Sequence, residues 1–276
     1  MRAELLNPVD GVPIAWESVG DEHAEAVLFV HGSALSKAIW RGMGYVKALA
    51  PKYRVITMDM RGHGRSGKPH DPRSYRMDTV VSDVLAVLDA AQIAQTHYVG
   101  YSFGARAGFA LGVTAPERMS SFVSLAGSFR ISEGSIAQLF FADYDRALAS
   151  GGMDAFIAGW EAQIGHRVDP VTRLAFRQND PLALRAYFAQ TEAGEAVSEA
   201  QLHAFKAPTL LMAGSLDSSR LVDSRLAAQL MPQASLVELP GRDHCDTLVP
   251  AADVLAAVVP FIDSHSLTQL AQSPTL

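Results

Sequence analysis

Three residues that lie far apart in the chain are of the types that activate a serine for covalent chemistry. Ser102 stands in the middle of the Gly-Tyr-Ser-Phe-Gly segment at residues 100–104, between a short apolar run and an Ala- and Leu-rich stretch. That pattern predicts a sharp strand-to-helix turn that exposes the serine hydroxyl. Asp217 and His244 each follow a later apolar run. Because an imidazole can remove the serine proton and a carboxylate can orient that imidazole, the three indicate an activated nucleophile.

Each of these residues also has a purely structural interpretation. Ser102 could cap the helix that follows it, since serine is a favoured N-cap residue. Asp217 could cap the next helix, which would leave Asp243 or Asp246 as the acid. We favour Asp217, because a residue adjacent to the base rarely points at its ring. His244 has no rival, since no other histidine follows a late predicted strand.

The three residues can meet only if the chain forms a parallel sheet, whose carboxyl strand ends share one edge. Continuous apolar runs, typical of buried parallel strands, alternate with helical patterns, and this order indicates an α/β fold with helices on both faces of the sheet. We expect a mostly parallel sheet of about eight strands. Residues 13–19 alternate as an edge strand does. The buried strands are predicted at residues 26–30, 53–58, 96–99, 121–126, 209–213 and 235–239, and helices at residues 39–49, 77–91, 103–114, 221–230 and 249–265.

The strand–helix alternation stops between residues 128 and 205, where the pattern is helical and rich in aromatic residues. We interpret residues 1–127 and 206–265 as the core, residues 128–205 as a helical cap insertion (here called the insert), and residues 266–276 as a flexible tail. We expect about half of the aromatic residues of the insert to pack within it. The others would line an apolar pocket over the serine.

The composition of the 276-residue chain excludes several other classes of protein. Its 49% apolar and 19% charged residues are typical of a globular protein, and a formal charge of −6 leaves no basic excess for nucleic acid. No apolar run reaches the roughly 18–20 residues that span a bilayer, and the first residues lack a signal-peptide core. The single cysteine excludes an intrachain disulfide. We therefore expect a cytoplasmic location, with no membrane partner; a homo-oligomer is left open.

No sequence pattern points to a metal or a cofactor. The glycine-rich turn at Gly62, Gly64 and Gly67 fits neither the dinucleotide fingerprint nor a P-loop. The histidines lack the spacing of metal ligands. We predict neither a metal nor a cofactor, and a small molecule as the substrate.

The order serine, aspartate, histidine, together with the His-Gly-Ser segment at residues 31–33, resembles the α/β-hydrolase fold family over residues 12–265. The resemblance implies Ser102 as nucleophile, His244 as base and Asp217 as acid. It also implies an oxyanion hole formed by the backbone N–H groups of Ser33 and Phe103.

The resemblance implies hydrolysis of a small carboxylic ester, lactone or thioester, with an apolar acyl or alcohol group, through an acyl-serine intermediate. A serine nucleophile argues against the epoxide hydrolases and haloalkane dehalogenases, which use aspartate there. Carbon–carbon bond hydrolases of ring-cleavage products share the triad, but the loop at residues 31–34 lacks the extra glycines typical of them. A small-molecule receptor that keeps its triad is the non-enzyme alternative.

A second alternative starts from residues 100–106, which are similar to the Gly-Tyr-Ser-x-Gly-Gly-Arg segment of menaquinone-pathway lyases on this fold. Those enzymes catalyse an elimination, and their arginine binds a substrate carboxylate. Arg106 matches that arginine, Ala105 departs from the second glycine, and Arg130 is a candidate for a further arginine. An exposed helix residue bonded to a nearby loop is the competing interpretation of Arg106, and we favour it because arginine is mostly a surface residue. The candidate substrate-binding residues are Arg106, Tyr101 and Trp160.

Overall fold

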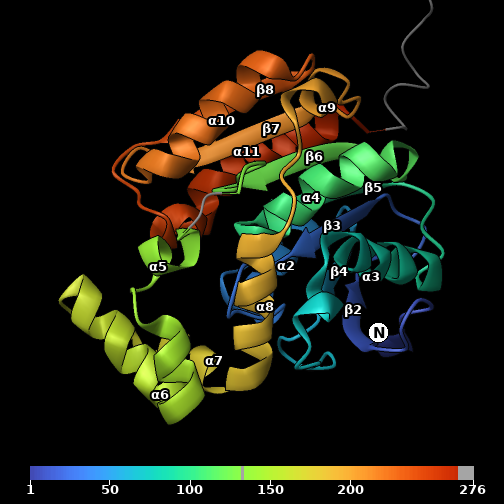
Figure 1. Cartoon of the computed structure of the whole chain (residues 1–276). Helices are drawn as coiled ribbons and strands as arrows, with labels where there is room; N and C mark the ends of the chain where they lie inside the picture. Colours follow the sequence, from blue (N-terminus) through green and yellow to red (C-terminus); the bar gives the residue numbers. More distant parts are fainter. Residues whose placement is uncertain (132–133, 267–276) are drawn as a thin grey trace, which may run out of the picture.

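The computed structural model describes residues 1–131 and 134–266 and contains one eight-stranded sheet in the order β1-β2-β4-β3-β5-β6-β7-β8 (Figure 1). The pairs β1–β2 and β2–β4 are antiparallel, and the remaining neighbours are parallel. The predicted mostly parallel sheet is thereby confirmed. The strands are β1 (Arg2–Leu6), β2 (Pro13–Val19), β3 (Ala26–Val30), β4 (Arg54–Met58), β5 (Thr96–Tyr101), β6 (Met119–Leu125), β7 (Thr209–Gly214) and β8 (Ala234–Leu239).

Residues 13–19 are not the edge strand that their alternation suggested. Strand β1, which the sequence analysis missed, pairs with β2 from Arg2 opposite Glu17 to Leu6 opposite Pro13, and therefore forms the edge. Its side chains alternate between exposed and half-buried positions. A strand of five residues in which no side chain is fully buried carries too weak a pattern to stand out.

Helices cover both faces of the sheet, as expected, because successive strand side chains point to opposite faces. In β3, Leu28 and Val30 pack with helices α3 (Met77–Ala90) and α4 (Phe103–Thr114), while Val27 and Phe29 pack with α2 (Tyr45–Leu49) and α11 (Ala251–Ser264). Helix α10 (Ser218–Leu230) lies against β7 and β8, on the side of the sheet opposite α11 (Figure 1).

The helix predicted over residues 39–49 is two short helices, α1 (Ala38–Gly42) and α2. Gly44 separates them with a φ of 91°, a left-handed conformation that an α-helix does not contain. Among the residues that the structure describes, the connections also include three 3₁₀ turns, η1 (Pro72–Tyr75), η2 (Pro116–Arg118) and η3 (Cys245–Leu248).

The insert contains five helices among the described residues and leaves the core between β6 and β7 (Figure 1). Helix α8 packs against α6 and against η1 of the core. The helices are α5 (Ser135–Leu139), α6 (Tyr144–Ile164), α7 (Pro170–Arg177), α8 (Pro181–Ala193) and α9 (Glu199–His203).

The aromatic residues of the insert form its own core to a greater extent than we expected. Trp160 stacks on Phe176 with ring centroids 5.0 Å apart, and Phe140 contacts both Phe156 and Phe188. All of these side chains are buried. The expectation that half of them line the pocket is wrong, because the helices of the insert bury these large apolar side chains against one another.

Two further sequence predictions concern the C-terminal tail and membrane-spanning segments. Of the predicted tail, residues 267–276 lie outside the described residues. Within the described part of the chain, no helix is long and apolar enough to cross a membrane.

Candidate active site

Ser102 sits at a strained turn between β5 and α4. Its φ of 53° and ψ of −114° lie outside the regions that ordinary residues adopt. Its N–H donates to the carbonyl oxygen of Leu125, at 2.8 Å, which holds the turn against β6. A Cβ on Gly104 would overlap the carbonyl oxygen of Val30, so only glycine lets the helix start this close to β3. The glycines therefore permit the turn that lifts the serine hydroxyl away from the sheet.

His244 bridges Ser102 and Asp217. Its Nε2 lies 2.9 Å from the Ser102 hydroxyl oxygen, and its Nδ1 lies 2.7 Å from Asp217 Oδ2. An ionised carboxylate accepts hydrogen bonds only, so Nδ1 carries the proton and neutral Nε2 can accept one from the serine. The structure thus brings together, at the carboxyl ends of β5, β7 and β8, three residues up to 142 positions apart.

Neither Ser102 nor Asp217 caps the helix that it precedes. Both occupy N-cap positions, of α4 and α10 respectively, yet neither side chain bonds to the first turn of its helix. The Asp243 carboxylate instead accepts a hydrogen bond from the Asp246 N–H at 3.0 Å. The geometry therefore favours Asp217 over Asp243 and Asp246 as the partner of His244.

The backbone N–H groups of Ser33 and Phe103 are both available at the cavity beside Ser102. Both residues line this cavity, and no described residue accepts a hydrogen bond from either N–H. The loop that carries Ser33 is held by buried His31, whose Nε2 accepts a bond from the Met60 N–H at 3.1 Å. The proton of His31 therefore lies on Nδ1, which donates to the Gly32 carbonyl oxygen at 2.8 Å.

Tyr187, on α8 of the insert, is a site residue that the sequence analysis missed. Its hydroxyl lies 2.6 Å from the Ser33 hydroxyl, and its ring contacts those of Phe103 and His63. Burial raises the pKa of Tyr187, so its hydroxyl stays protonated. Tyr187 thus joins the insert to the loop of Ser33. No local motif marks it, because this contact is formed only when α8 packs on the core.

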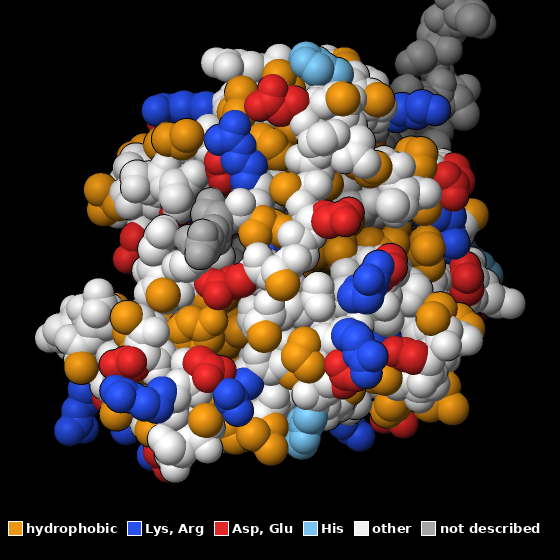
Figure 2. Space-filling view, in the orientation of Figure 1, with side chains coloured by type: hydrophobic (Ala, Val, Ile, Leu, Met, Phe, Trp, Pro, Cys, Tyr) orange, Lys and Arg blue, Asp and Glu red, His pale blue; other side chains and the backbone are white. Residues whose placement is uncertain are grey.

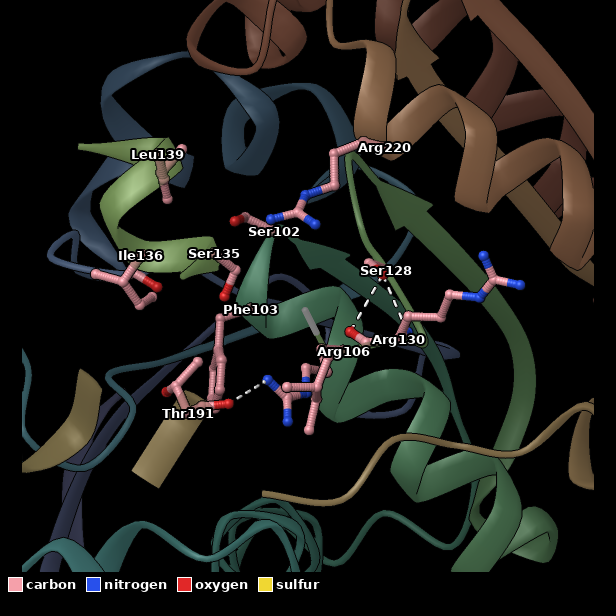
Figure 3. Close-up of a pocket in the computed structure, with 12 residues that line it drawn as sticks. Ser102, Phe103, Arg106, Ser128, Arg130, Ser135, Ile136, Leu139, Thr191 and Arg220 are labelled. Atoms are coloured by element: carbon pink, nitrogen blue, oxygen red, sulfur yellow. Dashed lines mark hydrogen bonds between the residues drawn. The ribbon is translucent and has the colours of Figure 1, made fainter. Parts of the chain in front are cut away.

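The cavity beside Ser102 has a volume of about 40 Å³ and is more polar than we expected (Figure 3). Three arginines and four serines line it, and no acidic residue does so among the described residues. The prediction of an apolar pocket lined by aromatic residues of the insert is therefore wrong. The lining residues are Ser33, Ser102, Phe103, Arg106, Ser128, Arg130, Ile131, Ser135, Ile136, Leu139, Thr191 and Arg220.

Arg106 lies in this cavity and is not the exposed helix residue that we favoured. Its Nη1 donates to the Thr191 carbonyl oxygen of α8 at 3.0 Å, while its buried Nε has no partner among the described residues. Burial lowers the pKa of Arg106 to about 10, and the charge of Arg220 contributes to the shift. Arg106 therefore stays charged at neutral pH next to Ser102.

The other two candidate substrate-binding residues do not line the cavity. Trp160 is part of the aromatic core of the insert. The Tyr101 hydroxyl donates to the carbonyl oxygen of His244 at 2.8 Å, and the two rings stack with centroids 5.5 Å apart. Tyr101 is thus placed to position His244 rather than to contact a substrate.

In residues 1–131 and 134–266 no three histidine, cysteine, aspartate or glutamate side chains gather as metal ligands do.

A mostly parallel sheet with a half-buried serine at a strained turn after β5, and with an aspartate and a histidine after β7 and β8, is the arrangement of one large class of proteins. The chain belongs to the alpha/beta hydrolase fold family, whose family model matches residues 25–249. This match confirms the resemblance seen in the sequence.

Several known proteins are similar to the chain over part or most of its length. Over 159 residues it is 31% identical to a Bacillus subtilis (strain 168) protein named "Putative 2-succinyl-6-hydroxy-2,4-cyclohexadiene-1-carboxylate synthase". The aligned residues make up 55% of this chain and 56% of that protein. Over 122 residues it is 31% identical to 3-oxoadipate enol-lactonase 2 of Acinetobacter baylyi, and the aligned residues make up 44% of each chain. A hydrolase structure from Pseudomonas aeruginosa PA01 is 25% identical, with a TM-score of 0.81 over 95% of this chain and 98% of that one. The chain thus spans about half the length of these two curated relatives.

Proposed function

We propose that this protein is a serine hydrolase that cleaves a small carboxylic ester, lactone or thioester through an acyl-Ser102 intermediate. The observation that carries the proposal is the position of His244, with Nε2 2.9 Å from the Ser102 hydroxyl and Nδ1 2.7 Å from Asp217. An imidazole held in this tautomer is oriented to take the serine proton, and the carboxylate stabilises the imidazolium that results. Membership of the alpha/beta hydrolase fold family supports this chemistry.

In the first half of the proposed reaction, Ser102 Oγ attacks the carbonyl carbon while its proton moves to His244 Nε2. The carbonyl oxygen becomes negatively charged and accepts hydrogen bonds from the N–H groups of Ser33 and Phe103, which have no other partner among the described residues. Loss of one such donor typically costs about 10²–10³ in rate. The bond to the leaving oxygen or sulfur then breaks, and the leaving group takes the proton from His244.

In the second half, a water molecule gives a proton to His244 Nε2 and attacks the acyl carbon. The ester bond to Ser102 breaks, and Ser102 Oγ regains the proton as the carboxylic acid leaves. His244 acts as base and then as acid in each half, so no other proton donor is required.

A panel of 4-nitrophenyl esters, γ-lactones and acyl thioesters tests this proposal. We expect the wild-type chain to hydrolyse at least one of the three classes, and Ser102→Ala to lower kcat by roughly 10⁴ or more. Ser150→Ala is the matched control, since Ser150 is exposed on α6, outside the site. Wild-type protein that hydrolyses no member of the panel but binds a small molecule would favour the receptor alternative.

A lyase is the second candidate, and two observations favour it: the identity to the B. subtilis protein and the position of Arg106 beside Ser102. In that reaction His244, acting through Ser102, would remove a carbon-bound proton and expel a leaving group from the neighbouring carbon. Turnover of a substrate in H₂¹⁸O distinguishes hydrolysis from elimination. Hydrolysis places one ¹⁸O in the carboxylic acid product, whereas elimination leaves both products unlabelled.

A further inference from the structure

The loop at residues 31–37, which carries Ser33, is held at both of its ends by the core of the molecule. At its start, Nε2 of buried His31 accepts a hydrogen bond from the Met60 N–H at 3.1 Å. At its end, the Lys37 N–H donates to the Asp59 carboxylate at 2.7 Å. Because all of these partners belong to the core, the ends of the loop do not depend on the insert.

The middle of the same loop hydrogen-bonds to the insert instead. The side-chain amide of Asn179, which lies just before α8, donates to the Ala34 carbonyl oxygen at 2.8 Å, and the Tyr187 hydroxyl lies 2.6 Å from the Ser33 hydroxyl. Both Asn179 and Tyr187 are buried. Among the described residues, neither Ser33 nor Ala34 forms a hydrogen bond to the core. The part of the loop that contains the Ser33 N–H is thus hydrogen-bonded to the insert alone.

Ala34 has a backbone conformation that needs such support. Its φ of 60° lies in the left-handed region, where the Cβ of an L-residue is crowded. A conformation of this kind costs free energy and persists only where the surrounding contacts determine it. The bond from Asn179 ends on the carbonyl oxygen of this same residue. Loss of that bond should therefore let the loop relax and turn the Ser33 N–H away from the reacting carbonyl.

Tyr187 contacts both residues whose backbone N–H groups form the proposed oxyanion hole. Its hydroxyl bonds to Ser33, and its ring meets the Phe103 ring edge to face, with centroids 4.8 Å apart. On its other sides the ring contacts His63 and Tyr75 of the core. A single side chain of the insert therefore connects the loop after β3 with the start of α4.

Helix α8 brings these side chains to the loop because it packs between α6 of the insert and η1 of the core (Figure 1). At its first turn, the Asp180 carboxylate caps the helix and lies 3.0 Å from His70 Nε2 of the core. On the face of the molecule seen in Figure 2, basic and acidic side chains are interspersed, so no block of like charge opposes this packing. Buried rings and a surface pair thus hold α8 in place together.

We propose that Asn179 and Tyr187 are positioning residues that hold the Ser33 N–H in the oxyanion hole, so that the packing of the insert on the core sets the rate of the reaction. The inference rests on the proposed hydrolase function and extends it from the core to the insert. Neither side chain lines the cavity beside Ser102, so each acts through the loop. Removing either contact should slow the step in which the carbonyl oxygen becomes negatively charged and leave the binding of a neutral ester nearly unchanged.

The test compares 4-nitrophenyl acetate with its thiono analogue, in which sulfur replaces the carbonyl oxygen. Sulfur is the weaker hydrogen-bond acceptor, so hydrolysis of the thiono ester depends less on the oxyanion hole. In Tyr187→Phe and in Asn179→Ala we expect kcat for the oxygen ester to fall by about 10- to 100-fold, with KM within about twofold. The ratio of kcat/KM for the oxygen ester to that for the thiono ester should fall by about tenfold or more. A general loss of folded protein would lower both rates equally.

Tyr144→Phe is the matched control, since it removes a tyrosine hydroxyl of the insert that bonds to Glu192 at 3.2 Å and not to the loop. We expect it to keep the wild-type ratio for the two esters. Tyr187→Phe is the cleaner of the two test variants, because Asn179 also bonds to carbonyl oxygens at the end of α7. Combined with Ser33→Ala, Tyr187→Phe should lose no more activity than the more damaging of the two single variants, since the two hydroxyls form one bond.

A second measurement does not depend on turnover. Hydrogen–deuterium exchange followed by mass spectrometry reports how often the loop at residues 31–37 opens. We expect exchange in this segment to be about 5- to 10-fold faster in Tyr187→Phe and in Asn179→Ala, and to stay at the wild-type rate in Tyr144→Phe.

The outcomes separate this inference from the proposed function. A wild-type ratio for the two esters in both test variants, or unchanged exchange of residues 31–37, overturns the positioning role and leaves the hydrolase proposal standing. Faster exchange of this segment in a chain that hydrolyses neither ester nor any other member of the panel supports the hold of the insert on the loop and contradicts the hydrolase.

Discussion

The hydroxyl of Tyr101 donates a hydrogen bond to the carbonyl oxygen of His244 at 2.8 Å, and the two rings lie nearly parallel, with an interplanar angle of 30°. The residue directly before the proposed nucleophile thus holds the backbone of the proposed base. Because Ser102 and Tyr101 are joined covalently, this bond ties the end of β5 to the loop after β8. The separation of Ser102 and His244 therefore depends on a contact that involves neither reacting atom.

The substitution Tyr101→Phe should remove this tie while keeping the ring. We expect the free energy of unfolding to fall by about 1 kcal/mol, since one buried hydrogen bond is lost. We expect kcat to fall by about tenfold, because the base is less well positioned. Tyr53→Phe is the control, since it removes a tyrosine hydroxyl bonded to Asp263, away from the site. If both variants keep wild-type kcat, Tyr101 has no positioning role.

The substitution Asp217→Asn tests the acid. The amide cannot fix the same tautomer of His244 or stabilise its charge, so we expect kcat to fall by about 10⁴ with little change in KM. Asp243→Asn should leave kcat within about twofold, since its carboxylate bonds to the Asp246 N–H instead. A larger loss in Asp243→Asn than in Asp217→Asn would assign the acid to the other residue.

These contacts show how much of the site can be predicted from residue type and order. Ser102, Asp217 and His244 each follow an apolar run that predicts a buried strand, and parallel strands place their carboxyl ends at one edge. That argument places the three residues near each other. The choice between Asp217, which follows β7, and Asp243, which follows β8 and directly precedes His244, depends on the direction of each side chain. The catalytic roles of Ser102, Asp217 and His244 stay predictions, and the variants proposed for each residue test them.

The close approach of α4 to β3 makes Gly104 the most sensitive glycine of the turn. A methyl group there would overlap the carbonyl oxygen of Val30, which belongs to the sheet and cannot easily move. We expect Gly104→Ala to lower the free energy of unfolding by about 1–3 kcal/mol in a urea titration. Gly42→Ala, where a Cβ meets nothing within 4 Å, should change it by less than about 0.5 kcal/mol. Equal stability of the two variants would show that the turn tolerates a side chain.

The stability of the fold should fall in mild acid because His63 is buried in its neutral form. Burial lowers the pKa of His63 from 6.5 to about 3 in the folded chain. Between these values the unfolded chain binds a proton that the folded chain does not, so the free energy of unfolding falls with decreasing pH by up to about 1.4 kcal/mol per pH unit. Urea titrations at pH 7.5 and pH 5 should show a shallower dependence for His63→Asn than for the wild-type chain. An equal dependence of the free energy of unfolding on pH in the two proteins would contradict the lowered pKa of His63.

Residues whose position depends on the insert were beyond prediction from the sequence. Tyr187 reaches Ser33 only because α8 packs on the core, and no local pattern distinguishes it from the neighbouring Phe188, which points into the insert. Arg220 likewise carries no motif. Arg220 belongs to α10 of the core rather than to the insert, and it lies beside Ser102 because α10 begins at the same edge of the sheet as α4.

Covalent labelling with a fluorophosphonate, followed by mass spectrometry of the intact protein and of its peptides, tests the central claim most directly. The reagent reacts with a serine that a neighbouring base activates and forms a stable adduct in place of the acyl-enzyme. The account predicts one adduct per chain, on Ser102, that forms much more slowly in His244→Ala and is lost in Ser102→Ala. An adduct on another serine, or undiminished labelling of Ser102→Ala, would contradict it.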